Sequence, residues 1–467
     1  MAKYDLRSEF ISTNVEGIQS IPKEWHIKQV RYLLKDGAEG IKIGPFGSAL
    51  KLEDMVDDGF SVYGQENVIK KDFSLGKRKI SETKFQEMSV YRIFPQDILI
   101  TMMGTSGKCE IVPSDINDGI IDSHLLRVRV KENQILPEFF KLLIDKSPEI
   151  SYQIQVFGKG SIMHGLNSGI VKSLNLPLPS IEEQKLILNF LDHETAKIDS
   201  LIAKQEKLIE LLKEKRQAVI SHAVTKGLNP DVNMKDSGVE WLGQVPEHWE
   251  ILKFDYAINT VSDIDHYMPN SVDEGIPYVM TGDLQDVVSE IDFESCKKVA
   301  YSDYQKLSRK IKTTKDDIIF ARYATIGTLS YVDIDKEFLV SYSCVTIKSN
   351  PLRTTGKYLS YYLKSQAFLQ AIQQQINSNT QGNVGVDSLR NVKIILPLLS
   401  EQDAIIDFLK VELSKMDNLI DKAQSAIQLM QERRTALISS AVTGKIDVTN
   451  WQNPNHNNNQ ANTELGA

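Results

Sequence analysis

The sequence has few of the features that mark a secreted or membrane protein. Its 467 residues include three cysteines, Cys109, Cys296 and Cys344, which lie far apart. So few thiols form no disulfide framework and favour a reducing compartment. No apolar run approaches the ~18–20 residues that span a bilayer. The first ten residues are polar with mixed charge, unlike a signal peptide. We therefore expect a cytoplasmic protein that does not bind a membrane.

Recognisable catalytic and metal-binding motifs are also absent. Gly104–Lys108 resembles a phosphate-binding loop, but its spacing is wrong and a turn is the better interpretation. No paired cysteines or His-x-x-x-His spacing provide for zinc, and the [Asn/Asp]-Pro-Pro-[Tyr/Phe] motif of amino-methyltransferases does not occur. We therefore expect no metal and no catalytic residue in this chain, and a binding function. The formal net charge of −8 argues against a nucleic-acid ligand, unless basic residues are concentrated locally.

The sequence does contain a long internal repeat. Residues 15–25 end in Ile-Pro-Lys-Glu-Trp and match residues 239–249, which end in Val-Pro-Glu-His-Trp. Glu183-Gln184 match Glu401-Gln402. The offsets are 224 (239 − 15) and 218 (401 − 183) residues, far beyond the ~20–50 residues of a solenoid repeat. The sequence therefore predicts a duplicated unit, each copy made of one α+β globular domain and one helix, with approximate two-fold symmetry.

Each copy ends in a predicted long helix. Pro177, Pro179 and Pro397 lie just upstream, and Ser180–Glu183 form a capping box. Apolar residues then recur every seven positions, which predicts helices over 180–226 and 400–444 that pack as an antiparallel coiled coil. At ~1.5 Å per residue each helix would be about 65 Å long, a rigid spacer with a globular domain at each end. Two independent amphipathic helices are the alternative. The expected helix–helix and subunit-interface residues are Leu191, Ile198, Leu201, Leu208, Leu212, Leu409, Met416, Leu419, Met430 and Leu437.

The remaining segments follow from these helices. We expect globular domains over residues 1–175 and 245–395, a linker over 227–244, and a disordered Asn- and Gln-rich tail over 449–467.

Basic segments recur at equivalent places in the two copies, over residues 70–84 and 297–315, and their duplication favours DNA binding over a merely solvated surface. Cations position a protein on phosphates, whereas base edges need forked or amide side chains. The candidate phosphate-binding residues are Lys77, Arg78, Lys79, Lys297, Lys298, Arg309 and Lys310. The candidate base-contacting residues are Gln65, Asn67, Thr105, Ser106, Lys108, Arg322, Tyr323, Asn379 and Gln381, with Thr281, Asp283 and Asn383 as further loop candidates.

The order of these motifs resembles the specificity subunit of type I restriction–modification systems. The resemblance rests on Trp-Leu-Gly-Gln-Val-Pro-Glu-His-Trp at 241–249, on residues 176–184, and on the helix ends 216–227 and 433–446; it covers about residues 10–448. It implies a non-catalytic chain with two target-recognition domains, 1–175 and 245–395, that bind the halves of a split, asymmetric DNA site. The paired helices would then set the gap between the half-sites.

The same resemblance implies the partners. These are double-stranded DNA, two modification subunits that methylate adenine N6 with S-adenosylmethionine, and restriction subunits that are motor–nucleases using ATP and Mg. No cofactor is expected in this chain. Two alternatives remain open: a coiled-coil protein-interaction adaptor without DNA specificity, and an enzyme with degenerate motifs.

Overall fold

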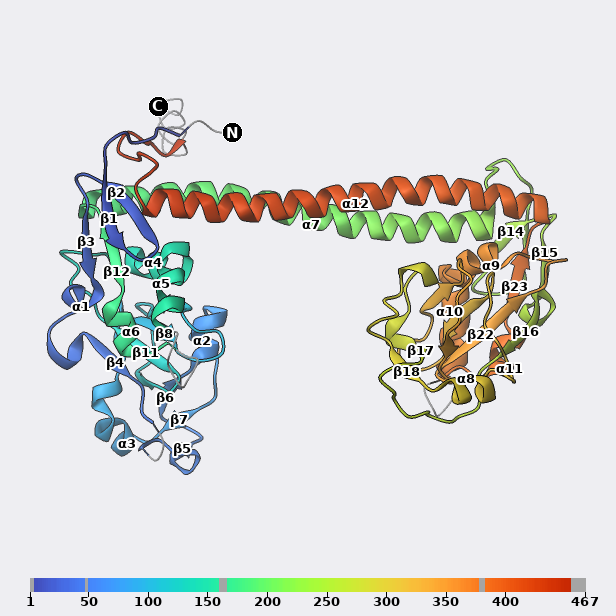
Figure 1. The fold of residues 1–467 in the computed structure, drawn as a ribbon, viewed down its shortest axis with the longest axis horizontal. Coiled ribbons are helices and arrows are strands. Elements are labelled where there is room, and N and C mark those ends of the chain that lie inside the picture. The colour runs from blue at the N-terminus through green and yellow to red at the C-terminus, as the bar shows by residue number, and fades with distance from the viewer. Residues whose placement is uncertain (1–3, 47–48, 159–165, 378–382, 455–467) are drawn as a thin grey trace, which may run out of the picture. The chain divides into compact units, whose positions relative to one another are not determined.

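The computed structural model describes residues 4–46, 49–158, 166–377 and 383–454 (Figure 1). The chain divides into two compact units: residues 1–204 with 426–467 form unit 1, and residues 205–425 form unit 2. Two long helices, α7 (Ile181–Lys226) and α12 (Leu399–Val442), each contribute to both units. Each unit therefore combines one globular domain with the first part of one long helix and the last part of the other.

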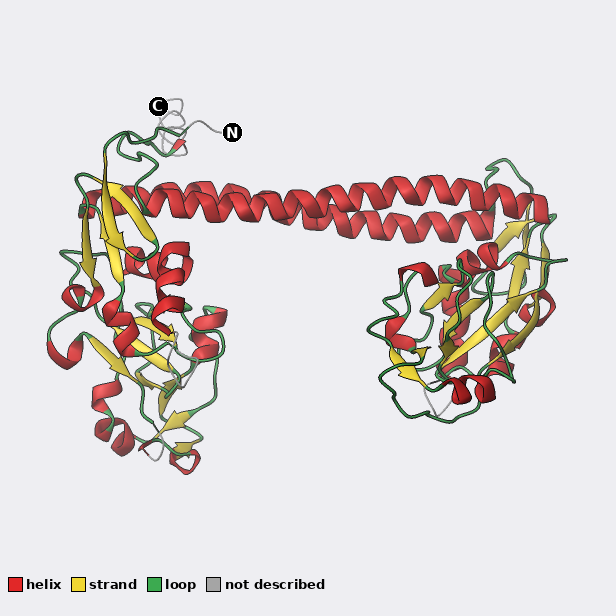
Figure 2. Ribbon diagram, in the orientation of Figure 1, coloured by secondary structure: helices red, strands yellow, loops and turns green. Residues whose placement is uncertain are grey.

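The globular domain of unit 1 is built on two small sheets (Figure 2). One has the strand order β4–β11–β8–β9, with all neighbours antiparallel. The other has the order β10–β6–β7–β5, in which β10 and β6 are parallel. The strands of unit 1 are β1 (Phe10–Val15), β2 (Ile18–Pro22), β3 (His26–Gln29), β4 (Ile41–Ile43), β5 (Met55–Val56), β6 (Phe60–Tyr63), β7 (Lys79–Ile80), β8 (Ile98–Thr101), β9 (Cys109–Ile111), β10 (Gly119–Ile121), β11 (Leu125–Val128) and β12 (Asn175–Leu178). Its shorter helices are α1 (Val30–Leu33), α2 (Gln65–Lys70), α3 (Glu82–Glu87), α4 (Pro137–Lys146), α5 (Pro148–Gly158) and α6 (Ser168–Ser173).

The globular domain of unit 2 repeats this plan. Its main sheet has the order β16–β22–β19–β20, and a smaller sheet β18–β17–β21 again holds one parallel pair, β17 and β21. The strands are β13 (Met234–Asp236), β14 (Gln244–Pro246), β15 (Glu250–Lys253), β16 (Ile258–Ser262), β17 (Ile276–Val279), β18 (Lys297–Val299), β19 (Ile318–Ala321), β20 (Leu329–Tyr331), β21 (Leu339–Val340), β22 (Cys344–Ser349) and β23 (Lys393–Leu396). The shorter helices are α8 (Tyr301–Leu307), α9 (Gly356–Leu363), α10 (Gln366–Asn377) and α11 (Val386–Asn391). The predicted duplication of an α+β domain is confirmed.

The tryptophan and glutamate motifs make the same contact in both copies. The Trp25 indole donates to the Glu183 carboxylate at 3.0 Å in unit 1, and the Trp249 indole donates to Glu401 at 3.0 Å in unit 2. Both indoles are 1% exposed, and a buried indole N–H needs an acceptor. The first turn of each long helix is thereby attached to the segment that opens its globular domain.

The glutamine beside each glutamate completes this attachment. Gln402 is fully buried, and its amide donates to the carbonyl oxygens of Arg353 at 2.8 Å and Pro397 at 3.0 Å while its oxygen accepts from the Thr354 hydroxyl at 2.9 Å. Gln184 is equally buried and makes three bonds to its surrounding loops in unit 1. The Glu-Gln pair is therefore structural.

In each unit, the buried tryptophan contacts the end of the long helix that follows the other globular domain. A Cβ on Gly444, just after α12, would lie 3.1 Å from the Trp25 ring, and one on Gly227, just after α7, would lie 3.3 Å from the Trp249 ring. Both glycines have positive φ, +72° and +77°, the left-handed conformation that commonly ends a helix. Glycine is needed at these positions for its backbone conformation, and at Gly444 also because an added Cβ would lie 2.3 Å from the Pro22 side chain.

Within each unit the two long helices run antiparallel. In unit 1, Arg434 near the end of α12 pairs with Asp199 in the first half of α7, with 2.9 Å between nitrogen and oxygen. In unit 2, Arg216 near the end of α7 pairs with Asp417 in the first half of α12 at 3.4 Å. These ion pairs are equivalent at the 218-residue offset, so the predicted antiparallel pairing is confirmed in both units.

The structure does not place one of the two predicted rows in the contact between the helices. Leu201, Leu208 and Leu419 are 46%, 42% and 49% exposed, whereas the half-buried Ile202 and Ile209 face the partner helix side. In a paired helix the contact positions alternate in steps of four and three, so the second row lies four residues after Ile198. The residues of the first row, Leu191, Ile198, Leu212, Leu409, Met416 and Leu437, are buried, and Met430 is half-buried.

The segment expected to be a disordered tail begins with an ordered stretch. Thr449 donates to the Asp447 carboxylate at 2.6 Å, and the Trp451 ring packs edge-on against Phe190 of α7 at 5.6 Å. The driving force is burial of a large aromatic side chain, which a compositional argument about Asn and Gln overlooks. Residues 455–467 lie outside the described residues.

Candidate nucleic-acid interface

The candidate DNA-contacting residues of unit 2 lie mainly on β18, α8 and the loops around them. These elements are at the end of the globular domain away from α7 and α12 (Figure 1). Within the described residues, no cluster of His, Cys, Asp and Glu could hold a metal ion. No helix of the described part is long and apolar enough to cross a membrane. The surface is therefore best described by its charges and rings.

Asp263, which follows β16, holds three basic side chains together. Its carboxylate accepts from Arg322 at 2.5 Å and Lys310 at 3.0 Å, and His266 lies 3.3 Å away. The side chains of Asp263 and Arg322 are 12% and 7% exposed, whereas Lys310 and His266 are 45% and 60% exposed. The buried pair therefore presents one lysine and one histidine to a ligand.

The charge state of this cluster follows from its geometry. Burial raises the pKa of Asp263, but the hydrogen bonds from Lys310 and His266 and the positive charges of Arg322 and Lys310 outweigh it, so the pKa lies below its ordinary value. Asp263 is thus ionised at neutral pH and neutralises part of the positive charge. Arg322 is committed to this buried pair, so the prediction that it contacts bases is not supported by its position.

Aromatic rings surround the exposed members of the cluster. Tyr342 stacks on His266 with 5.1 Å between ring centroids and 30° between planes, and Lys306 lies 5.3 Å from the centroid of Tyr267. Tyr267 is 43% exposed, while Tyr323 is half-buried beneath the Arg322 guanidinium. Flat rings beside cations suit stacking on bases and contact with phosphates.

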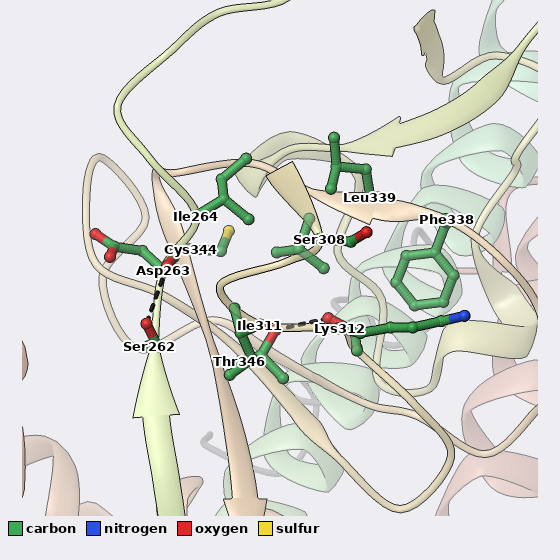
Figure 3. Close-up of a pocket in the computed structure, with 12 residues that line it drawn as sticks. Ser262, Asp263, Ile264, Ser308, Ile311, Lys312, Phe338, Leu339, Cys344 and Thr346 are labelled. Atoms are coloured by element: carbon green, nitrogen blue, oxygen red, sulfur yellow. Dashed lines mark hydrogen bonds between the residues drawn. The ribbon is translucent and has the colours of Figure 1, made fainter. Parts of the chain in front are cut away.

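A small pocket lies next to Asp263 (Figure 3). Its walls include Ile264, Ile311 and Leu339, and two of its polar groups, the hydroxyls of Thr313 and Thr346, are 2.6 Å apart. Because many of its walls are apolar and these hydroxyls bond to each other, we interpret the pocket as part of the domain core beneath the surface.

Unit 1 places different side chains on the same backbone. The amide of Asp122 donates to Tyr63 O at 2.9 Å, as the amide of Ser341 donates to Val279 O at 2.9 Å in unit 2, so the turns that begin at Asp122 and Ser341 are equivalent. In unit 1 the Asp122 carboxylate pairs with Arg78 at 2.9 Å. The Asp122-Ser-His sequence of this turn thus replaces Ser341-Tyr-Ser. The two domains share a backbone and differ in the chemistry they expose.

The predicted phosphate contacts fall into two groups. Lys77 and Arg309 are exposed and make no ion pair or hydrogen bond with any described residue. The others have partners: Lys79 pairs with Asp58 at 2.8 Å, Lys298 pairs with Glu294 at 2.9 Å, and Lys297 donates to the Pro269 carbonyl at 2.6 Å. Arg78 and Lys310 belong to the carboxylate pairs described above. Lys77 and Arg309 are therefore the freest cations of the predicted set.

The predicted base contacts are also divided. Asn67 is fully buried; its oxygen accepts from the Gly64 amide at 2.9 Å and its nitrogen donates to two loop carbonyls. Asp283 holds the equivalent turn in unit 2 by accepting from the Met280 amide at 2.8 Å. Both residues therefore support loops, and the prediction that Asn67 contacts a base is wrong because no atom of its amide is free.

The other candidates lie on or beside loops. Thr105 and Ser106 are exposed in the β8–β9 loop, and Lys108 pairs with Asp145 at 3.2 Å. Gln65 begins α2, and Thr281 begins the equivalent turn of unit 2; both are half-buried, as is Asn383. Asn379 and Gln381 lie outside the described residues.

Sequence reasoning missed Asp263, His266, Tyr267 and Tyr342. The first three lie in one loop, 263–267, whereas Tyr342 lies in the turn after β21, so the available signal was limited to the alternation of acidic, basic and aromatic residues over 263–267.

Two α+β domains on one duplicated plan, each with exposed cations, define a two-part DNA-recognition protein. A family model for the type I restriction modification DNA specificity domain matches residues 48–211 and again residues 264–428. These matches cover more than half of the chain, which therefore belongs to that family. Its members supply DNA specificity to type I restriction–modification systems and are non-catalytic.

Individual relatives agree with this assignment. The chain is 24% identical over 448 residues to the putative type I restriction enzyme MjaX specificity subunit of Methanocaldococcus jannaschii, covering 92% of this chain and 96% of that protein. It is 21% identical over 456 residues to the EcoBI specificity subunit of Escherichia coli, covering 96% and 91%. A solved structure described as "Structural basis underlying complex assembly and conformational transition of the type I R-M system" superposes with a TM-score of 0.65 at 15% identity, over 91% of this chain and 99% of that one. This last likeness shows the fold.

Proposed function

We propose that each globular domain binds one half of a split, asymmetric double-stranded DNA site. The observation that carries this proposal is the pair of equivalent turns beginning at Asp122 and Ser341, where one backbone presents two different sets of side chains. Two identical surfaces would select a palindrome, whereas two different surfaces on one backbone select unlike half-sites. Such a chain acts where the DNA is, which favours the cytoplasm of a prokaryotic cell.

Phosphate contacts would come chiefly from the unpaired cations. Lys77→Ala and Arg309→Ala should each weaken binding to all sequences and lower the slope of log affinity against log salt by about 0.9, because each removes one phosphate contact. The slope is measured by fluorescence anisotropy on a duplex that carries the methylated site. Lys207→Ala on α7, whose lysine pairs with Glu210 at 2.8 Å, is the matched control and should leave the slope unchanged. Wild-type affinity that does not depend on salt would instead favour the protein-interaction adaptor.

Base contacts are proposed for the exposed loop residues. In unit 2 these are Lys310, His266 and Tyr267, arranged by Asp263; in unit 1 they are Thr105, Ser106 and His124. Lysine donates to guanine in the major groove, and a hydroxyl can bond to several bases. His266→Ala should relax the choice of base in one half-site and leave the other half-site unchanged, as measured by sequencing methylated adenines.

The long helices are proposed to set the gap between half-sites. Deleting seven residues from each helix, 205–211 and 422–428, keeps the helical phase on both sides of the deletion. It removes about 10 Å of helix, so the preferred gap should shorten by about 3 base pairs at 3.4 Å per step. Methylome sequencing of cells carrying the variant measures the gap. The same deletion in α7 alone puts the two helices out of register and should abolish modification.

Exposed leucines at equivalent positions are the proposed contacts for partner subunits. Leu201 corresponds to Leu419 and Leu211 to Leu429, and all four are between 46% and 65% exposed. Large apolar side chains repeated on the outer face of two helices favour protein contacts over solvent. Their duplication supports two modification subunits for each chain. S-adenosylmethionine would then bind to the modification subunits, and ATP with Mg to the restriction subunits.

A further inference from the structure

One aromatic residue of α7 is covered by both ends of the chain. Phe190 is 1% exposed, and two rings pack edge-on against it: Tyr4 at 5.2 Å and Trp451 at 5.6 Å between centroids. The Tyr4 hydroxyl also donates to the Glu194 carboxylate at 2.7 Å, one helical turn further along α7. This face of α7 is therefore a site for aromatic side chains, one of which donates a hydroxyl to Glu194.

The equivalent face of α12 has the same residues at the 218-residue offset. Phe408 takes the place of Phe190, and Glu412 takes the place of Glu194. Even the neighbouring lysine is retained, because Lys415 donates to Glu412 at 2.6 Å as Lys197 donates to Glu194 at 2.8 Å. The site for an aromatic side chain is thus duplicated with the rest of the helix.

The α12 site is not covered within the described part of the chain. Phe408 is 40% exposed and its neighbour Val411 is 53% exposed. The segment that follows α7, residues 228–233, corresponds to residues 446–451 after α12, but its sequence is Leu-Asn-Pro-Asp-Val-Asn. Because this segment carries no aromatic residue, unit 2 has no equivalent of Trp451 with which to cover Phe408.

We propose that the Phe408 face of α12 binds a tyrosine or tryptophan side chain from a modification subunit, as the Phe190 face binds Tyr4 and Trp451. This inference rests on the proposed function. The occupant follows from the duplicated site: an edge-on ring against Phe408 and a hydroxyl or indole N–H donated to Glu412. The two modification subunits consequently bind with unequal affinity. The subunit at α12 gains an aromatic contact with Phe408. At α7 the equivalent place on Phe190 is already taken by Tyr4 and Trp451.

The experiment is a titration of the full-length chain with its modification subunit, followed by native mass spectrometry to separate the first and second binding steps. The wild-type chain should show two steps of different affinity. Phe408→Ala should weaken the tighter step by about 10- to 100-fold, the effect expected for loss of an aromatic anchor, and leave the other step unchanged. Glu412→Gln keeps an acceptor on α12 and should have a smaller effect on the same step.

A second variant tests the covered site. Tyr4→Ala with Trp451→Ala exposes Phe190 and should strengthen the weaker step, so that the two affinities become closer. Equal weakening of both steps by Phe408→Ala, or no change in either, would overturn the inference while two subunits still bind. If the wild-type chain binds no modification subunit, the proposed function itself fails. Thermal melting of Phe408→Ala, whose side chain is exposed, should match the wild type.

Discussion

At the residue scale, one loop position shows that the two copies share their backbone even where their sequences differ. Gly104 and Ala324 are equivalent, and both lie in the left-handed region, with φ of 63° and 54°. Glycine adopts this conformation freely, whereas alanine does so at a cost of about 1 kcal/mol. The loop fold is therefore imposed on Ala324 by its surroundings.

We expect reciprocal substitutions at these two positions to act in opposite directions. Gly104→Ala should destabilise unit 1 by about 1 kcal/mol through backbone strain alone, because an added Cβ meets nothing within 4 Å. Ala324→Gly should stabilise unit 2 by a smaller amount, since glycine also raises the entropy of the unfolded chain. Urea unfolding midpoints measure both; a shift in the same direction would contradict a shared loop conformation.

Asp263 predicts how the stability of unit 2 depends on pH. Its pKa is lowered in the folded chain, so the folded state binds this proton at a lower pH than the unfolded state does. Its contribution to stability is complete above the ordinary carboxyl pKa and is lost as the pH falls through the lowered value, below about pH 4. Acid should therefore loosen the surface loops around Asp263 in unit 2. This residue does not contribute to the pH dependence of unit 1.

Asp263→Asn tests this expectation directly. At pH 7 it leaves the buried Arg322 without its counter-charge and should cost about 3 kcal/mol or more. The stability difference from wild type should shrink as the pH is lowered towards 3, as measured by urea unfolding at several pH values. Asp335→Asn, at an exposed acid, is the control and should leave the free energy of unfolding unchanged at every pH. A difference that stays constant with pH would assign the effect to packing.

At the element scale, the attachment of each long helix depends on one buried amide. Replacing Gln402 with alanine leaves three partners without their hydrogen bonds, two of them in the buried residues Thr354 and Pro397, at about 1–3 kcal/mol for each buried unsatisfied group. We expect Gln402→Ala to lower the unfolding free energy of unit 2 by on the order of 3 kcal/mol or more. Gln428→Ala in unit 1, whose side chain is exposed and bonds to Glu432 at 3.1 Å, should change the unfolding free energy of its own unit by less than about 0.5 kcal/mol.

The two faces of α7 give a second test. Ile198 is 7% exposed and Leu201 is 46% exposed, although they lie three residues apart on one helix. Ile198→Ala should cost about 2–4 kcal/mol because it empties part of the helix–helix contact. Leu201→Ala should have little effect on unfolding but should weaken binding of a modification subunit. Calorimetry and a binding titration separate the two effects; an equal loss of stability would restore the predicted contact row.

The helices also show how far the sequence determines the structure. Repetition with a seven-residue period predicted two long antiparallel helices, because the period is set by the geometry of helix packing. Leucine occurs both at Leu201, on the outer face of α7, and at Leu212, in the contact with α12. The residue type alone therefore could not separate the second row of helix contacts from the exposed leucines proposed to bind partner subunits. The Asp263 cluster was beyond prediction, since its members are brought together by the tertiary fold of several loops.

At the scale of the whole molecule, each unit is assembled from segments of both copies of the repeat. Each unit uses a globular domain, the start of the helix that follows that domain, and the end of the helix that follows the other domain. Neither globular copy is therefore complete on its own in the sequence. This exchange explains why the helix-end motifs at 216–227 and 433–446 are both retained although they contribute to different units.

The meeting of the two chain ends in unit 1 has a consequence for how such genes can be rearranged. Leu6 bridges to Ile446, and the Arg7 amide donates to the Lys445 carbonyl at 3.2 Å, so the segments around Leu6 and Ile446 lie where unit 2 has the continuous segment 227–244. Joining these two segments by a flexible linker and opening the chain at Gly238 would interrupt neither long helix. The circularly permuted protein should fold and select the same DNA, which means that either copy could come first in the gene.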